Sequence, residues 1–201
     1  MSFERKIYFI RHGEKEKSDS HSSIVKESVG LTQNGVDQSR KTGNFLLENA
    51  KISKIVASPL NRTKLTADAI GEILNLNVDT DVRFRERILF TKELENETAA
   101  LEFKKVQDNW DYSAYGGESL NQVVGRFAEG INDLLSSLDN GFTEICIVTH
   151  GRALQSYLHS IAPNLGYGTH ELKIQPCSIT TINFGPDGEI LHVDTNLISH
   201  L

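Results

Sequence analysis

Apolar residues are arranged along this chain in two alternating patterns. Short apolar runs over 7–10, 52–57 and 145–148 predict buried strands. Between and beside them, residues 32–49 and 118–138 carry apolar side chains at the three-to-four residue spacing of helices. The second of these helices has the more regular pattern. Strands that alternate with helices favour an α/β fold with a parallel sheet.

Turn and cap residues set further boundaries. Thr32 and Ser58 are good N-caps, and Pro59 is a good first residue for a helix that continues to about residue 74. Towards the C-terminus, two segments of alternating hydrophobicity, 178–184 and 189–193, flank a Gly-Pro-Asp-Gly turn. This combination predicts a β-hairpin.

Two segments have no place in that framework of strands and helices. Residues 15–30 are polar and show no clear period, which is typical of a loop. Residues 91–110 have helical spacing with many charges, and with the glycine-rich loop that follows they could cover the rim of the sheet. No repeat or linker marks a second domain. We therefore expect one domain over 1–201, with candidate lid segments over 15–30 and 88–117.

Composition narrows the classes of partner. The net charge of −6 at pH 7 argues against a general binder of nucleic acid or of membrane surfaces. It does not exclude an anionic substrate, because a local cluster of arginines can override the mean charge. Cys146 and Cys177 match neither a metal-ligand spacing nor a disulfide framework. Because no segment resembles a signal peptide or a membrane span, we expect a cytoplasmic protein. The sequence leaves its oligomeric state undecided.

Charged and polar residues directly follow the predicted strands. Arg11 and His12 follow the first, Arg62 lies in the first helical turn after the second, and His150 follows the third. The carboxyl ends of parallel strands share one rim, where ligands bind. Metal sites usually add carboxylate or cysteine ligands, and arginines repel cations, so we expect no metal. The set suits a phosphoryl group held by arginines and attacked by a histidine.

Ordered motifs at strand ends and helix starts extend over nearly the whole chain. They are Arg11-His12-Gly13-Glu14, Leu31-Thr32-x-x-Gly35, Ser58-Pro59-Leu60-x-Arg62-Thr63-x-x-Thr66-Ala67, Gly117-Glu118-Ser119 and Thr149-His150-Gly151. In this order they resemble the histidine phosphatase superfamily, the phosphoglycerate mutase-like clan, in its smaller branch. The resemblance implies a three-layer α/β/α sandwich with a mostly parallel central sheet. It also implies a phosphohistidine mechanism without a metal or other cofactor.

The resemblance assigns roles to the residues at the rim. His12 is expected to be the nucleophile, with its second ring nitrogen donating to a backbone carbonyl. Arg11, Arg62 and His150 are expected to bind the phosphoryl oxygens and the charge that builds in the transition state. Glu86 is expected to protonate the leaving oxygen and then to activate the attacking water.

The sequence offers more than one candidate for the catalytic acid and several for further substrate contacts. From its neighbours alone, Glu86 between two arginines is either a solvated ion pair or a catalytic carboxylate, and the resemblance favours the second interpretation. Glu14 and Glu118 are weaker candidates for the same role. Further candidates for substrate binding are Ser18, Arg87 and Gly151.

Several departures from the mutases favour hydrolysis. Ser18 stands where the mutases carry an asparagine, and the segment after Phe90 is shorter and lacks their basic pair for the sugar-acid carboxylate. The leading hypothesis is therefore a metal-independent phosphatase for a small phosphorylated metabolite. Phosphoglycerate mutase is the alternative. A protein phosphohistidine phosphatase is disfavoured by Glu86, and a non-catalytic anion-binding module by the complete set of rim residues. The substrate itself is not encoded in any motif.

Overall fold

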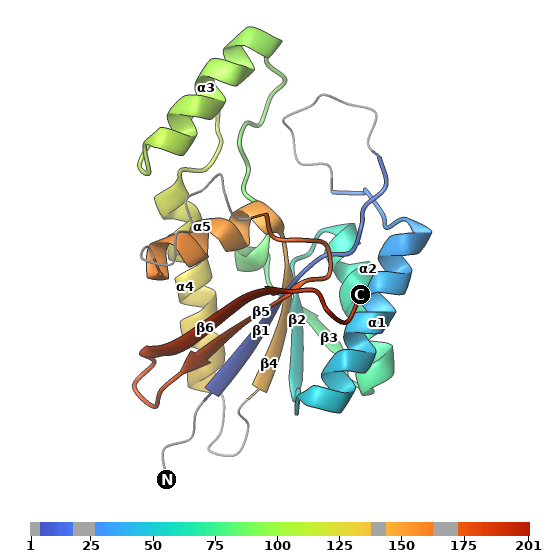
Figure 1. The fold of residues 1–201 in the computed structure, drawn as a ribbon. Helices are drawn as coiled ribbons and strands as arrows, with labels where there is room; N and C mark the ends of the chain where they lie inside the picture. The colour runs from blue at the N-terminus through green and yellow to red at the C-terminus, as the bar shows by residue number, and fades with distance from the viewer. Residues whose placement is uncertain (1–4, 18–26, 138–143, 163–172) are drawn as a thin grey trace.

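The computed structural model describes residues 5–17, 27–137, 144–162 and 173–201. Within them, six strands form one sheet in the order β3-β2-β4-β1-β5-β6 (Figure 1). The strands are β1 (Arg5–Arg11), β2 (Lys54–Ala57), β3 (Val78–Thr80), β4 (Glu144–Thr149), β5 (Ile179–Phe184) and β6 (Ile190–Leu197). The first four strands pair in parallel, and β5 and β6 add an antiparallel edge. The mostly parallel sheet and the hairpin are both confirmed.

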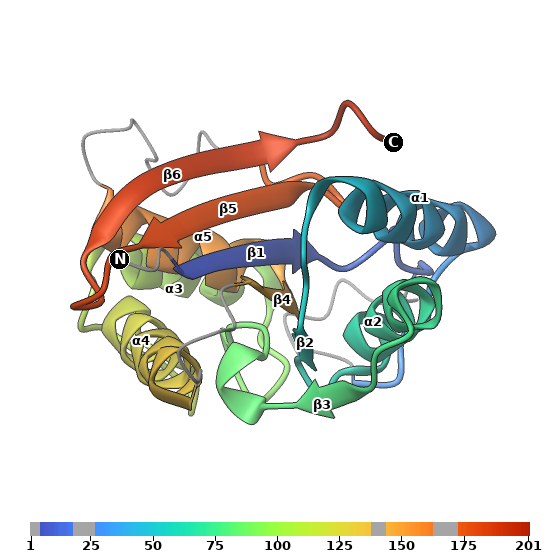
Figure 2. The same cartoon turned by 90° about the horizontal axis from the view of Figure 1, so that it is seen from below.

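Helices cover both faces of this sheet. They are α1 (Gln33–Asn49), α2 (Asn61–Leu74), the 3-10 helix η1 (Val82–Phe84), α3 (Asn96–Asp108), α4 (Leu120–Ser137) and α5 (Gly151–Ile161). α1 and α2 lie on one face, and α4 and α5 on the other (Figure 2). Because side chains alternate across a strand, Ile7 and Phe9 of β1 pack with α4 and α5, whereas Tyr8 and Ile10 pack with α1 and α2. The three-layer sandwich is confirmed.

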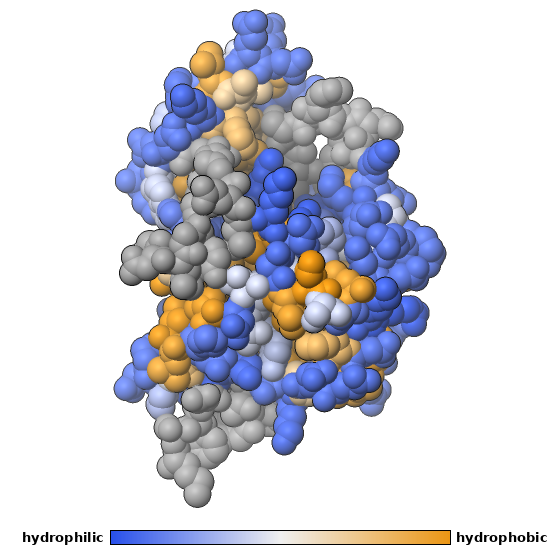
Figure 3. All heavy atoms as spheres, in the orientation of Figure 1, coloured by the Kyte–Doolittle hydropathy of each residue, from blue (hydrophilic) through white to orange (hydrophobic). Residues whose placement is uncertain are grey.

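The surface of the sandwich follows from the same amphipathic pattern. Hydrophilic residues cover the outer side of α1, as a helix that buries only one stripe requires (Figure 3). Hydrophobic residues gather in this view over the outer end of the β5–β6 hairpin, where Ile190 and Leu191 are exposed. Within the described residues, the helices are too short or too polar to cross a bilayer.

Some predicted boundaries are confirmed and others are wrong. Thr32 caps α1, since its side chain accepts a hydrogen bond from the amide of Gly35. α2 begins only at Asn61, with Leu60 as its N-cap, so the prediction of Ser58 as cap was wrong. The reason is that the Ser58 hydroxyl lies 2.8 Å from Nε2 of His150 and forms a hydrogen bond at the rim instead of capping the helix. Arg62 still falls in the first turn of α2.

Other elements begin or end at residues that differ from the predicted ones. β6 continues to Leu197, beyond the predicted end at residue 193, because register shifts along the β5–β6 ladder break the simple alternation. β2 begins two residues later than predicted, at Lys54, and α4 begins at Leu120 rather than at residue 118. The predicted end of α4 at 140–141 lies outside the described residues.

The segment 88–117 stands above the carboxyl ends of the parallel strands, where Figure 1 shows α3 apart from the sheet. It has a small apolar core of its own, formed by Leu89, Phe90 and Val106 with partly buried neighbours around them. Its position is that of a cover over the rim, although its action as a lid stays a prediction. The other candidate lid, 15–30, lies partly outside the described residues.

Candidate active site

The loop after β1 places His12 at the centre of the rim. The backbone amide of His12 donates to the carbonyl of Thr149, 2.9 Å away, which keeps the loop beside the end of β4. The next amide, that of Gly13, donates to Oγ1 of Thr66 on α2. A Cβ on residue 13 would lie 2.5 Å from the carbonyl oxygen of Gly35, so only glycine fits there.

The His12 ring is held in the form that a nucleophile needs. Its Nδ1 lies 2.8 Å from the carbonyl oxygen of Gly13. Because a carbonyl only accepts, Nδ1 carries the proton and Nε2 keeps its lone pair. Burial, with the nearby positive charges of Arg62 and Arg11, lowers the pKa of His12 to about 3. His12 is therefore neutral at neutral pH.

His150 faces His12 and holds Arg62. The two histidine rings are 5.3 Å apart between centroids. Nη2 of Arg62 donates to Nδ1 of His150 over 3.2 Å, since an arginine has no acceptor. The proton of the neutral ring is thus on Nε2, which donates to the Ser58 hydroxyl. Burial and the Arg62 charge keep the pKa of His150 well below its ordinary value. Direct binding of phosphoryl oxygens by His150 stays a prediction.

Arg11 presents a half-buried guanidinium beside the first turn of α5. Its Nη1 donates to the carbonyl of Ile174. Its Nε is buried and has no hydrogen-bond partner among the described residues, so one donor is left for a ligand. A Cβ on Gly151 would lie 3.3 Å from this Nε, closer than most such contacts. Gly151 therefore leaves room for the Arg11 guanidinium.

Glu86 is fixed through one oxygen and leaves the other available. Oε1 accepts from the amides of Arg87, at 2.9 Å, and Ala153, at 3.0 Å. Oε2 accepts no hydrogen bond within the described part of the chain. The backbone before Glu86 is anchored, because Thr149 donates to the carbonyl of Phe84. Its negative charge raises the pKa of both rim arginines against the lowering effect of burial.

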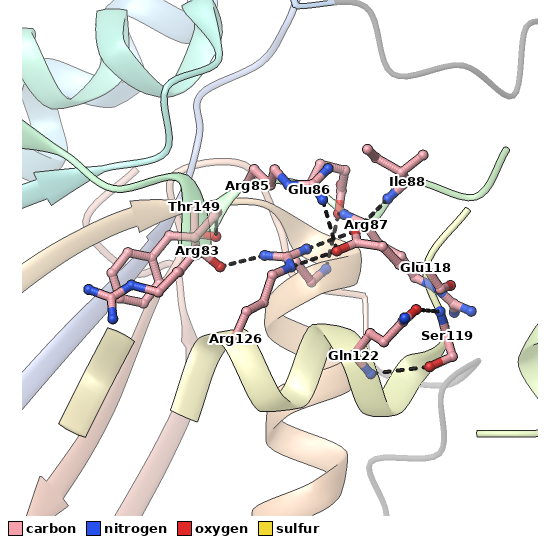
Figure 4. A network of polar contacts seen from close by, with 12 residues as sticks. Arg83, Arg85, Glu86, Arg87, Ile88, Glu118, Ser119, Gln122, Arg126 and Thr149 are labelled. Atoms are coloured by element: carbon pink, nitrogen blue, oxygen red, sulfur yellow. Dashed lines mark hydrogen bonds and ion pairs between the residues drawn. The ribbon is translucent and has the colours of Figure 1, made fainter. Parts of the chain in front are cut away.

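The two weaker acid candidates are occupied elsewhere. Glu118 accepts from the guanidinium groups of Arg85 and Arg126 and from the amide of Ile88, which uses both of its oxygens (Figure 4). Glu14 accepts from the side chains of Thr32 and Asn34 at the start of α1, and these bonds lower its pKa. Glu86 alone of the three combines a fixed carboxylate with an uncommitted oxygen.

The Arg87 guanidinium is directed mainly to backbone carbonyls and not to the phosphoryl site. The Arg87 guanidinium donates to the carbonyls of Glu118, at 3.1 Å, and Val106, at 2.9 Å. It therefore ties the end of α3 to the start of α4, and any contact with substrate would involve its remaining nitrogen. Ser18 lies outside the described residues. Both assignments stay predictions.

Two residues near the rim carry charges that sequence patterns did not single out as catalytic. Lys15 follows the first motif, and its pKa is lowered by burial and by the charges of Arg62 and Arg11. Arg152 directly follows His150-Gly151 in the first turn of α5, which is the only signal for it. Ser58, which is uncharged, also lies at the rim although its pattern indicated only a helix cap. No group of three metal-ligating side chains occurs in the described ranges.

The chain belongs to the histidine phosphatase superfamily, because the family's branch 1 profile matches residues 7–196. It is 27% identical over 187 residues to a Proteus mirabilis (strain HI4320) protein named probable phosphoglycerate mutase GpmB, covering 89% of this chain and 84% of that one. It is 26% identical over 216 residues to a protein of the same name from Serratia proteamaculans (strain 568), covering 97% and 98%.

Solved structures with other activities share the fold. A mycobacterial glucosyl-3-phosphoglycerate phosphatase with inorganic phosphate superposes with a TM-score of 0.79 at 20% identity, covering 98% of this chain and 99% of that one. A mutant phosphoserine phosphatase from Entamoeba histolytica, in complex with phosphoserine, gives 0.79 at 23% identity with the same coverage. At such identities the likeness shows the fold alone.

We expect the free energy of unfolding to fall as the pH is lowered from about 6.5 to about 4, in part because of His12. An unfolded histidine takes up a proton near pH 6.5, whereas folded His12 does so only near pH 3. Between these values the unfolded state binds more protons. Stability therefore rises with pH, by up to about 1.4 kcal/mol per pH unit for one group.

Denaturant unfolding at several pH values measures this slope. His12→Asn should flatten it, because the variant has no proton to take up at that position. His192→Asn, which replaces an exposed histidine on β6, should keep the parental slope. Equal slopes in the parent and in His12→Asn would contradict the expected role of His12.

Proposed function

We propose that this protein hydrolyses a phosphate monoester of a small metabolite through a phosphohistidine on His12. The observation that carries the proposal is the state of the His12 ring, which is neutral, buried and oriented with Nδ1 on the Gly13 carbonyl. The guanidinium groups of Arg11 and Arg62 lie near enough to lower its pKa. A nucleophile with a free lone pair beside two fixed cations suits attack on a dianionic phosphoryl group.

In the first step, Nε2 of His12 attacks phosphorus and the bond to the leaving oxygen breaks. Arg11 and Arg62 bind the equatorial oxygens, whose charge they stabilise as the transition state forms. His150 orients Arg62 through Nδ1. Glu86, entering the step protonated, donates its proton to the leaving oxygen, so that an alcohol and not an alkoxide departs.

In the second step, water attacks the phosphorus of phosphohistidine and the phosphorus–nitrogen bond breaks. Glu86, now a carboxylate, accepts the proton of the water, which returns it to its starting form. The products are inorganic phosphate and neutral His12. The only co-substrate that the balance needs is water.

Phosphoryl transfer between hydroxyls is the second candidate function, since the Proteus and Serratia relatives are named as probable phosphoglycerate mutases. The two functions share the first step and differ in the acceptor. Supplying 2,3-bisphosphoglycerate and following phosphoglycerate isomers separates them. Isomerisation faster than phosphate release would assign the mutase.

We expect phosphate release from small monoesters to persist after exhaustive treatment with a metal chelator. The reason is that arginine side chains, and not a metal ion, neutralise the phosphoryl charge in the proposed site. A screen over sugar phosphates, phosphoglycerates, nucleotides and phosphopeptides, with and without chelator, measures this. Loss of all turnover on chelation, with recovery on adding zinc or magnesium, would overturn the proposal.

A further inference from the structure

The segment that carries Glu86 has no regular secondary structure. The 3-10 helix η1 ends at Phe84, and residues 85–90 lie outside the helices and strands. A backbone without a helix or a strand ladder takes its conformation from the contacts that it makes with other segments. The position of the Glu86 carboxylate therefore depends on what holds this segment on either side.

Glu118, which lies two residues before α4, contacts the chain on both sides of Glu86. Its backbone amide donates to the carbonyl of Ile88 over 2.7 Å, and the amide of Ile88 donates to Oε2 of Glu118 over 3.0 Å. On the other side of Glu86, Nη2 of Arg85 donates to Oε1 of Glu118, also over 3.0 Å. One carboxylate thus fixes the residue before Glu86 and the second residue after it (Figure 4).

Arg126 of α4 holds Glu118 in turn. Its Nε donates to Oε1 of Glu118 over 2.9 Å and its Nη2 donates to Oε2 over 3.2 Å, which is a bidentate arrangement. Its Nη1 donates to the carbonyl of Arg83 in η1. The side chains of Arg126 and Glu118 are only 13% and 12% exposed, so water competes little for these bonds. Arg126 therefore connects a regular helix to the irregular segment on which Glu86 stands.

The charges in this network act on Glu86 as well. Burial lowers the pKa of Arg126, and the negative charges of Glu118 and Glu86 oppose this effect. Burial also lowers the pKa of Arg87 to about 10, again against the charges of the same two carboxylates. Glu86 is thus a second carboxylate within electrostatic reach of both arginines. Glu118 keeps their charges compensated, so that neither guanidinium needs the uncommitted oxygen of Glu86 as its partner.

We propose that Glu118 and Arg126 are positioning residues for Glu86, and that their ion pair sets the direction in which Oε2 of Glu86 faces the leaving oxygen. The inference rests on the proposed function, in which Glu86 protonates that oxygen. Neither residue contacts the substrate in this mechanism. Their effect passes through the backbone of residues 85–88, which includes the amide of Arg87 that donates to Oε1 of Glu86.

The test compares Glu118→Gln with the parent on an alkyl phosphate and on p-nitrophenyl phosphate. Glutamine keeps the size of the side chain, but its one carbonyl oxygen cannot accept the bonds that two carboxylate oxygens accept. We expect kcat/KM for the alkyl ester to fall by about 10- to 100-fold, the cost of a misplaced catalytic group. The value for the aryl ester should change by less than about threefold, because its phenolate leaves without a proton.

The choice of kcat/KM makes the comparison independent of the second chemical step. This constant reports the steps up to departure of the alcohol, so slow hydrolysis of phosphohistidine does not hide a difference between the two esters. A merely structural role for the ion pair would lower the amount of folded protein and reduce both values together. Dependence on the leaving group therefore separates positioning from destabilisation.

Two further variants sharpen the test. Arg126→Lys keeps the positive charge but cannot form the bidentate pair, so it should show a smaller loss that is again confined to the alkyl ester. The double variant Glu86→Gln/Glu118→Gln should hydrolyse the alkyl ester no more slowly than Glu86→Gln alone, because no acid is left to position. If Glu118→Gln is not folded by circular dichroism, the ratio of the two esters in Arg126→Lys decides in its place.

Glu144→Gln is the matched control, because Glu144 accepts from the backbone amide of Lys51 at the end of β4 opposite the rim. It should keep the parental ratio of the two esters. Equal losses with both esters in Glu118→Gln, a parental value with the alkyl ester, or additive losses in the double variant overturn this inference and leave the phosphatase function intact. A parent that hydrolyses no ester overturns the proposed function and the inference with it.

Discussion

Replacing His12 by alanine is expected to lower kcat/KM for every phosphate ester by about 10⁴-fold or more. The substitution removes the atom that attacks phosphorus, and losing a covalent nucleophile costs an enzyme on the order of 10⁴- to 10⁶-fold. Arg11 and Arg62 would remain to bind the substrate, so the loss should appear in kcat more than in KM. Steady-state kinetics on p-nitrophenyl phosphate and on an alkyl ester measure both constants.

His192→Ala provides the control, because it removes an exposed imidazole from β6. It should leave both constants unchanged. A His12→Ala protein that is folded by circular dichroism and still turns over within about tenfold of the parent would show that His12 is not the nucleophile.

Replacing Glu86 by glutamine is expected to slow alkyl esters by about 10²- to 10⁴-fold, the usual contribution of a general acid. The amide keeps the shape of the side chain but cannot donate as a carboxylic acid. An alkyl phosphate leaves as a strongly basic oxygen, whereas p-nitrophenyl phosphate leaves as a stabilised phenolate and hardly needs a proton. The loss should therefore be much smaller for the aryl ester when phosphorylation of His12 is rate-limiting.

Burst kinetics identify the limiting step, because slow hydrolysis of phosphohistidine would make both esters slow together. Glu14→Gln is the matched variant, since Glu14 is exposed and its carboxylate is bound to Thr32 and Asn34. It should show no dependence on the leaving group. Parental rates with alkyl esters in Glu86→Gln would remove Glu86 from the acid role.

The parts of the fold that sequence predicted are those with strong local signals. The buried runs of β1 and β4 and the regular stripe of α4 leave little choice of conformation, and the strand ends then place Arg11, His12 and His150 together. The capping role predicted for Ser58 failed because a tertiary contact, with His150 Nε2, outweighed a local preference. No local pattern reports a partner 92 residues away.

The contacts that individual charged residues make could not be predicted from the sequence, for a similar reason. Arg87 resembles a substrate ligand in its motif, yet its guanidinium is directed to two carbonyls from segments folded far along the chain. Arg152 carries no motif beyond its neighbours, and only the tertiary contact of its guanidinium with Phe103 of α3 places it beside a pocket. Side-chain direction depends on tertiary packing, which hydrophobic periodicity does not encode.

Trapping the covalent intermediate tests the central claim most directly. The protein is mixed with a ³²P-labelled phosphate ester, quenched in base within the first turnovers, and digested for peptide mapping. The account predicts label that is stable in base and labile in acid, on the peptide containing His12 and absent from His12→Ala. Label on His150 instead, or undiminished turnover with no protein-bound phosphate at any quench time, would contradict it.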